Sequence, residues 1–498
     1  MNRSSTTAAL SAAALALLAG CTVGPEYAKP GIEIPGSFTA GQEISANIPR
    51  DDSKVAPPQP AQLPVASTAD LANWWTTMGD ETLTGLIGSA LQANHDIRLA
   101  VARLDESRAL VGIARADRGV QIDADGRVSR SRSSETTTNG SRFQSDVDDE
   151  FRAGVSASWE VDFFGRVRRS VQAARADLDA AEASVNDAHV LIAADVAQRY
   201  VELRGAQQRL EVNRRAIAVR EQTLDLSKAL LKTGLAAEFD VAQAEAELAS
   251  RRAASPVFEA QIRQNAHALA VLCGKSPADL LELTTASGPI PVPPASLALG
   301  VPADLLMRRP DLRRAERQLA AATARIGVAT ADLYPRFSLL GSFAMESANA
   351  GDLADLDSRS YSFGPSVTWS VFNNGRVKSN IDAADARTTQ SLIAYEQAVL
   401  VAIREAEDAL VGLSSERTRL DSLQTAVKSN ERAVELAESL FKTGLSALTP
   451  VLDNQRRLYD AEDQAAQSRT AVATSAVAVY KALGGGWQPG ESRKEIRQ

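Results

Sequence analysis

Apolar residues recur at every seventh position along two long stretches of this chain. The first stretch contains Val196, Leu203, Leu210, Ile217, Leu224 and Leu231, and the second contains Ala406, Leu413, Leu420, Val427, Val434 and Phe441. Residues 166–231 and 376–441 each hold one glycine and no proline. The pattern predicts two α-helices of about 66 residues, each about 100 Å long.

An earlier apolar series in the first stretch is four residues out of phase with the later one. It consists of Val171, Leu178, Val185 and Ile192. A phase change of four residues is a stutter, which locally unwinds a left-handed coiled coil. We therefore expect the long helices to be rods that pack against other helices along much of their length. A simple coiled-coil spacer would show the same pattern.

Shorter stretches before each rod alternate between apolar and polar residues. The apolar positions are Phe151, Ala153, Val155, Ala157, Trp159 and Val161 in one run, Phe337, Leu339, Gly341, Phe343 and Met345 in another, and Tyr361, Phe363, Pro365, Val367, Trp369 and Val371 in a third. A fourth run, 120–130, is weaker. Such runs of about 9–11 residues are typical of outer-membrane barrel strands. A soluble, half-buried sheet would show the same alternation.

Four strands are too few to close a membrane barrel, because the edge strands would leave backbone groups unpaired in lipid. The smallest closed barrels have about eight strands, so several chains must share one barrel. Two chains would give eight strands and three would give twelve, and the pattern does not choose between them. The polar loops expected at 132–150 and 347–360 suit the extracellular side. Trp159 and Trp369 lie where strand gives way to rod, which suits an interfacial aromatic belt.

The chain contains an internal repeat. The segment from Trp159 to Val167 matches the segment from Trp369 to Val377, which is 210 residues later. Upstream, Asp96 matches Asp311 at an offset of 215, so the five-residue difference is expected in the hairpin loop. We divide the chain into repeat 1 (81–283), a proline-rich connector (284–302), repeat 2 (303–487) and a C-terminal tail (488–498).

The N-terminus predicts export and a lipid anchor. Residues 1–20 read as a signal peptide, with an apolar run from Ala8 to Leu18 that is too short to span a bilayer. Leu18-Ala19-Gly20-Cys21 resembles a lipoprotein cleavage box, in which the cysteine carries the lipid. Thr22 is not the aspartate that retains lipoproteins at the inner membrane. The alternative is an ordinary signal peptide with an incidental cysteine. Residues 21–80 then form an extended N-terminal segment.

Composition and charge exclude several other functions. The net charge of −8 argues against nucleic-acid binding, which requires concentrated positive charge. His95, His189 and His267 are far apart in sequence, so a metal site has no support. The chain contains no GxSxG motif and no Walker-type loop. We therefore expect no catalytic residue and no cofactor beyond the lipid on Cys21. The remaining alternative to a transport role is a structural coiled-coil lipoprotein without transport activity.

Several motifs in order carry a resemblance to a known family. They are the segment from Cys21 to Pro30, Trp74-Trp75 with Gly79-Asp80, Asn94-His95-Asp96, Arg308-Arg309-Pro310-Asp311-Leu312, and Gly364-Pro365 with Gly375-Arg376. Over residues 21–487 the chain resembles the outer-membrane factor family, the TolC-like efflux channels, and most closely their lipoprotein (NodT/OprM-type) branch.

The resemblance implies a mainly α fold with a membrane β-barrel portion. Three chains would form a TolC-like 12-stranded barrel in the outer membrane and a tunnel of about 12 helices through the periplasm. An equatorial collar would surround the tunnel. The implied function is passive, multidrug-type export of small molecules, which contributes to antibiotic resistance. The implied partners are a periplasmic adaptor protein and an inner-membrane pump, of RND type or another.

The resemblance also assigns roles at the periplasmic tips of the rods, where the chain is expected to turn back through 232–240 and 442–453. Gly234-Leu235 and Gly444-Leu445 would contact the adaptor.

The same resemblance implies a gate at these tips. Asp453 matches an aspartate that forms a ring across the closed tunnel end, and Asp240 matches a residue that locks neighbouring helices. Phe441 and Ser446 stand where some relatives carry the tyrosine and arginine of that lock, so apolar contacts such as those of Leu448 would contribute to the gate.

The anchor can be tested directly. The substitution Cys21→Ala should abolish labelling of the protein with a radioactive or clickable fatty acid. The barrel should still insert, because its lipid-facing strands are an independent attachment. Labelling that persists in the alanine variant would rule out Cys21 as the acylated residue.

Overall fold

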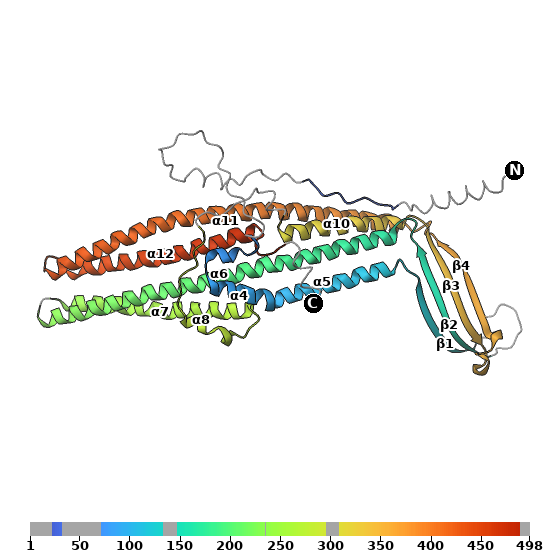
Figure 1. Cartoon of the computed structure of the whole chain (residues 1–498), viewed down its shortest axis with the longest axis horizontal. Coiled ribbons are helices and arrows are strands. Elements are labelled where there is room, and N and C mark those ends of the chain that lie inside the picture. Colours follow the sequence, from blue (N-terminus) through green and yellow to red (C-terminus); the bar gives the residue numbers. More distant parts are fainter. Residues whose placement is uncertain (1–21, 32–70, 133–146, 235, 295–307, 489–498) are drawn as a thin grey trace, which may run out of the picture. The chain divides into compact units, whose positions relative to one another are not determined.

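The computed structural model describes residues 22–31, 71–132, 147–234, 236–294 and 308–488 (Figure 1). Its helices and strands are η1 (Trp74–Met78), α4 (Glu81–Ala93), α5 (His95–Ala116), β1 (Gln121–Arg132), β2 (Val147–Val161), α6 (Arg166–Lys232), α7 (Glu238–Leu272), η2 (Pro277–Leu280), α8 (Glu282–Thr285), α10 (Pro310–Ala331), β3 (Arg336–Ser347), η3 (Ala350–Asp352), η4 (Leu356–Ser358), β4 (Arg359–Thr368), α11 (Arg376–Lys442) and α12 (Leu448–Ala482). The expected signal peptide, Cys21 and Leu235 lie outside the described residues.

The element bounds confirm the internal repeat. Helices α6 and α11 each have 67 residues and begin 210 positions apart, as α7 and α12 do. Helices α5 and α10, and strands β1 and β3, are offset by 215 positions. The five-residue difference therefore falls between the two strands of each hairpin, where the sequence predicted it.

The chain divides into two compact units, described separately. The hairpin unit contains the described residues 22–31, 103–132, 147–181 and 314–395. The rod unit contains the described residues 71–102, 182–234, 236–294, 308–313 and 396–488.

In the hairpin unit the four strands form one antiparallel sheet in the order β1-β2-β3-β4 (Figure 1). The register aligns side chains of one kind across the sheet. One row is apolar, with Ala124, Val155, Phe343 and Tyr361, and the next row, on the opposite face, is polar, with Asp123, Ser156, Ser342 and Ser362. The alternation read from the sequence is therefore a property of the whole sheet.

The strand ends differ from the expected ones. Strand β1 continues to Arg132 and β2 already begins at Val147, so the loop expected at 132–150 is shorter than predicted. Backbone pairing continues into this polar segment because β1 and β2 stay in register, with Arg132 opposite Val147. Strand β4 ends at Thr368, so Trp369 and Val371 lie just beyond it.

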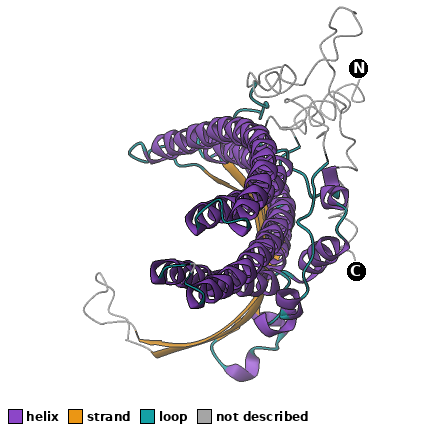
Figure 2. Cartoon of the chain, turned by 90° about the vertical axis from the view of Figure 1, so that its left-hand side faces the viewer, coloured by secondary structure: helices purple, strands orange, loops and turns teal. Residues whose placement is uncertain are grey.

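In the rod unit, each long helix returns along a shorter one, α6 along α7 and α11 along α12. Figure 2 looks at the tip end of these hairpins and shows the helices in pairs. The predicted heptad residues Val196, Leu203, Ala406 and Leu413 are buried in one large apolar cluster. This cluster also holds Trp74, whose ring stacks on Tyr480 at a centroid distance of 4.8 Å.

The described part of the connector runs across the rods without regular secondary structure from 286 to 294. Ile290 packs against Val201 of α6 and Ala473 of α12. The carbonyl of Pro294 accepts a hydrogen bond from Arg417 of α11 at 2.9 Å. The connector therefore ties both repeats together within the rod unit.

Among the helices that the structure describes, none is both long enough and apolar enough to span a bilayer.

A carboxylate introduced on the apolar face of the sheet should affect membrane insertion differently from one introduced on the polar face. Phe343 lies in the middle of β3 on the apolar face and is about half exposed, whereas the hydroxyl of the adjacent Ser342 lies 2.8 Å from that of Ser362 on the polar face. Phe343→Asp should disfavour membrane insertion, because a charge on a lipid-facing strand is destabilising, up to about 2–4 kcal/mol for an arginine or lysine at the midplane and less for a carboxylate. Ser342→Asp should be tolerated. The folded fraction on unheated gels after refolding into lipid vesicles measures both effects, and equal insertion of the two variants would contradict this assignment of faces.

Candidate functional site at the rod tips

The two rod tips have nearly the same backbone. Helix α6 ends at Lys232 and α7 begins at Glu238, whereas α11 ends at Lys442 and α12 begins at Leu448. The turns are therefore shorter than the expected 232–240 and 442–453, because the returning helices begin before Asp240 and Asp453. Each turn needs a residue with positive φ.

Glycine supplies this left-handed conformation at both tips. The φ angle is +73° at Gly234 and +72° at Gly444, a region that side chains with a Cβ rarely adopt. The Gly234 N–H donates to Leu231 O at 3.0 Å, and the Gly444 N–H donates to Phe441 O at 3.0 Å. These bonds satisfy helix-end carbonyls as in other αL caps. Leu445, directly after Gly444, is 77% exposed, and its backbone N–H donates to Leu440 O at 2.9 Å.

Asp240 has a structural role that its position explains. It is the third residue of α7, and its carboxylate accepts a hydrogen bond from the Ala237 N–H at 3.0 Å. This is one half of a capping box, in which the third residue of the helix bonds back to the N–H of the N-cap residue. Phe239, beside it, is 70% exposed and was not singled out from the sequence.

Asp453 lies in the second turn of α12 with its side chain exposed. Its nearest basic partner is Arg456 on the same helix face, with 3.4 Å between Oδ1 and Nη2. Such an exposed pair three residues apart contributes only a few tenths of a kcal/mol. The carboxylate is therefore available to ions and other charged groups outside its own chain.

Leu448 is packed inside the second hairpin. It is 5% exposed and belongs to a small apolar cluster with Ala437, Val451 and Leu452, against which Phe441 packs. These contacts lie within one chain, where they hold the tip of α11 against α12, and the gate role of Leu448 stays a prediction.

A sequence comparison with known proteins identifies the family. The profile described as "Outer membrane efflux protein" matches residues 86–275 and 301–485, one segment for each repeat. The chain belongs to the outer membrane efflux protein family. The resemblance noted from the sequence motifs is thereby confirmed.

Individual relatives match over nearly the full length of this outer membrane efflux protein. It is 31% identical over 479 residues to "Nodulation protein T" of Rhizobium leguminosarum bv. trifolii, covering 95% of the chain and 96% of that protein. It is 29% identical to "Toluene efflux pump outer membrane protein TtgI" of Pseudomonas putida, covering 95% and 97%. The solved structure of the outer-membrane channel OprN has a TM-score of 0.84 at 32% identity, covering 94% of this chain and all of that one.

The matches confirm the TolC-like channel fold and an outer-membrane efflux function. They favour a channel over the alternative of a structural spacer lipoprotein, because the relatives are named as efflux proteins and channels. They also agree with the expectation that the protein is not an enzyme.

Sequence reasoning missed a buried arginine that joins the two rod hairpins. Arg220 of α6 is 3% exposed and donates to Leu452 O at 3.3 Å and to Gln455 Oε1 at 3.2 Å, both on α12. Burial lowers the pKa of its guanidinium. The residue before Asp453 is thus held by the first hairpin of this efflux protein.

A signal for Arg220 was present in the sequence. It lies three positions after Ile217 of the apolar heptad series, where a second core position is expected. The equivalent positions one heptad before and after are Asn213 and Ser227, and both are fully buried. Of these buried polar residues, Asn213 bonds to Arg251 O and Ser255 of α7 and Arg220 bonds to α12, whereas Ser227 bonds to Thr223 of its own helix.

The two tryptophans of the expected interfacial belt have equivalent surroundings. The Trp159 indole N–H donates to Arg118 O, and the Trp369 N–H donates to Leu333 O, each at 3.0 Å. The accepting carbonyls lie 215 positions apart, so the repeat extends to these contacts. Both rings are partly exposed, at 38% and 54%.

Proposed function

We propose that three copies of this chain form a passive duct that carries small molecules from the periplasm through the outer membrane. The observation that supports it most is the four-stranded sheet. One face of the sheet is apolar and the other is polar, and no described residue pairs with the outer side of its edge strands β1 and β4. In lipid such edges must be paired.

Twelve strands from three chains satisfy this requirement and leave a lumen lined by the polar face. The rods would continue that lumen, because each chain contributes two long helices and two shorter returning helices beyond the strands. A barrel of eight strands from two chains would be filled by side chains and leave little room for cargo. The wider barrel is therefore the better duct.

The proposed gate lies at the tips. Three Asp453 carboxylates around one axis would repel each other and attract cations. Arg456 offsets part of this charge in each copy, and Arg220 fixes the neighbouring Leu452 carbonyl. Asp240, which caps its own helix, is the weaker gate candidate. The exposed Leu445 beside Gly444, with Gly234 and Leu235 at the other tip, is the proposed contact for an adaptor.

Energy and cargo selection would come from partners. In this proposal the protein is a non-enzymatic duct, and it requires a periplasmic adaptor and an inner-membrane pump. One relative is named for toluene efflux and another for cation efflux, so proteins of this family serve pumps with different cargo. A lipid on Cys21 would add a second attachment to the outer membrane, beside the barrel with Trp159 and Trp369 at its interface.

Conductance tests the duct. Purified protein added to planar lipid bilayers should give discrete ion-conducting steps, and cross-linking in mild detergent should end at three chains. The reason is that only a closed, shared barrel both inserts and conducts. Folded protein that inserts without conducting, or cross-linking that ends at two chains, would contradict the proposal.

The gate predicts a charge effect at one position. Asp453→Ala should weaken cation selectivity and reduce block by divalent and trivalent ions, because it removes the proposed ring of carboxylates. Glu435→Ala is a matched control, since Glu435 on α11 forms a similar exposed pair with Arg432 at 2.8 Å. Unchanged selectivity and block in intact Asp453→Ala trimers, measured in bilayers, would show that Asp453 is only a helix residue.

A further inference from the structure

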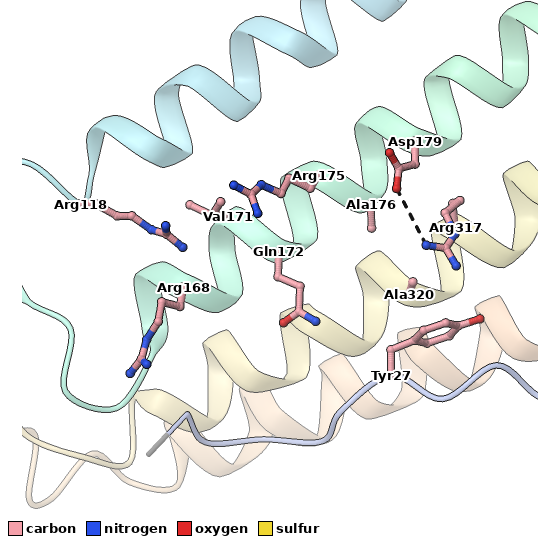
Figure 3. A pocket seen from close by; sticks show the side chains of 10 residues that line it. All are labelled: Tyr27, Arg118, Arg168, Val171, Gln172, Arg175, Ala176, Asp179, Arg317 and Ala320. Atoms are coloured by element: carbon pink, nitrogen blue, oxygen red, sulfur yellow. Dashed lines mark ion pairs between the residues drawn. The ribbon is translucent and has the colours of Figure 1, made fainter. Parts of the chain in front are cut away.

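An arginine-lined cavity lies in the hairpin unit, close to the strand ends. It has a volume of about 240 Å³ and is bordered by Tyr27 of the N-terminal segment, the end of α5, the start of α6 and the middle of α10. Figure 3 shows four arginines around it, Arg118, Arg168, Arg175 and Arg317. Pockets for whole drug-sized ligands begin at about 300 Å³, so this cavity suits a smaller charged group.

Two of the four arginines are in no ion pair within the described chain, and the carboxylate that lines the cavity, Asp179, pairs with Arg317. Arg168 pairs with Asp162 at 3.5 Å, and Arg317 pairs with Glu316 and, at 3.9 Å, with Asp179. The side chains of Arg118 and Arg175 form no ion pair with any residue that the structure describes. Figure 3 shows these two side chains extending toward each other, Arg118 from the turn after α5 and Arg175 from α6. Two guanidinium groups that converge in this way are stabilised by an anion between them.

The wall formed by Tyr27 is fixed by several contacts. Arg169, which is nearly fully buried, donates to Val23 O at 3.1 Å and Gly24 O at 3.2 Å, and pairs with Glu26 at 2.9 Å. The Tyr27 hydroxyl donates to Glu316, the partner of Arg317. The cavity is therefore part of the folded hairpin unit and not a gap between loose segments.

The repeat provides an internal comparison. The positions that correspond to Arg118, Arg168 and Arg175 in the second copy hold Leu333, Lys378 and Asp385. The same backbone thus forms without the arginine cluster, so the repeat fold does not require it.

The position of the cavity indicates the source of the anion. The Arg118 carbonyl accepts the Trp159 hydrogen bond at the strand end, and Arg168 is the third residue of α6. Arg175 follows two turns later, about 10 Å along the helix. The headgroup layer of a leaflet is about 5–8 Å thick, and it would begin where the apolar strand face ends. The cavity therefore begins at headgroup level.

We propose that this cavity binds the phosphate of an anionic phospholipid headgroup from the periplasm-facing leaflet of the outer membrane. Arg118 and Arg175 are the direct phosphate ligands, and Arg168 and Arg317 form the rim with their own acidic partners. The inference goes beyond the duct and rests on the proposed function only for the placement of the sheet in the membrane. A bound lipid would hold the ends of α5 and α6 together just below the barrel.

Calorimetric titration of the detergent-purified protein with short-chain lipids tests the site. Dioctanoyl phosphatidylglycerol should bind more tightly than dioctanoyl phosphatidylcholine or inorganic phosphate. Arg118→Gln and Arg175→Gln should each weaken its binding about tenfold, as expected for one lost charge-assisted contact. Arg175→Lys should restore part of the affinity, and Lys378→Gln, the matched charge loss in the second copy, should change nothing.

Several results would overturn the proposal. Equal binding of the two lipids, or equal losses in Arg175→Gln and Lys378→Gln, would show general charge attraction. Inorganic phosphate that binds as tightly as phosphatidylglycerol would show a free-phosphate site instead of a lipid site. Bilayer conductance of the wild-type protein and of Lys378→Gln separates this outcome from a failure of the duct, because both should conduct whether or not the lipid site exists.

Discussion

Backbone hydrogen bonding at the two edges of the sheet constrains the rest of the molecule. Strands β1 and β4 are each paired on one side within the chain. Unpaired N–H and C=O groups cost several kcal/mol each when they face hydrocarbon, and no apolar side chain can compensate for them. A chain whose sheet has one lipid-compatible face therefore has to share that sheet with other copies. The proposed duct follows from this one requirement, because every chain that shares the barrel also brings its long helices to the assembly.

The two repeats contribute similar backbones to this arrangement but differ in their charged residues. Both tips turn on a glycine with positive φ, and both tryptophans donate to equivalent carbonyls. The arginines are less symmetric. Arg209 of the first rod forms a two-contact pair with Asp463 of α12, and Arg220 binds the backbone of the same helix. The first repeat thus supplies cations that position the second, and its unpaired arginines near the strands have no counterpart 210 or 215 residues later.

The periodicity of apolar residues in the sequence predicted most of the helices and strands. Seven-residue spacing and two-residue alternation predict helices and strands directly, because these patterns depend on neighbours in sequence. The change of the repeat offset from 215 to 210 located the hairpin loops. The strand ends at Val147 and Thr368 depended on pairing with another strand and were misplaced. The arginine cavity could not be read from the sequence, since it forms only when Tyr27 reaches Glu316, 289 positions away. The burial of Leu448 likewise depends on how α12 packs against α11.

The most direct test of the shared barrel is cross-linking between edge strands of neighbouring copies. The variants carry one cysteine on β1, in place of Asp123, and one on β4, in place of Ser362 or Ser366. These positions lie on the polar face of the sheet. The native Cys273 is buried and should not react. Disulfides form only where Cα atoms come within about 7 Å. A shared barrel predicts oxidised products that form a ladder ending at three chains in membranes. Chains that remain monomeric across this series, or a ladder that ends at two, would contradict the account.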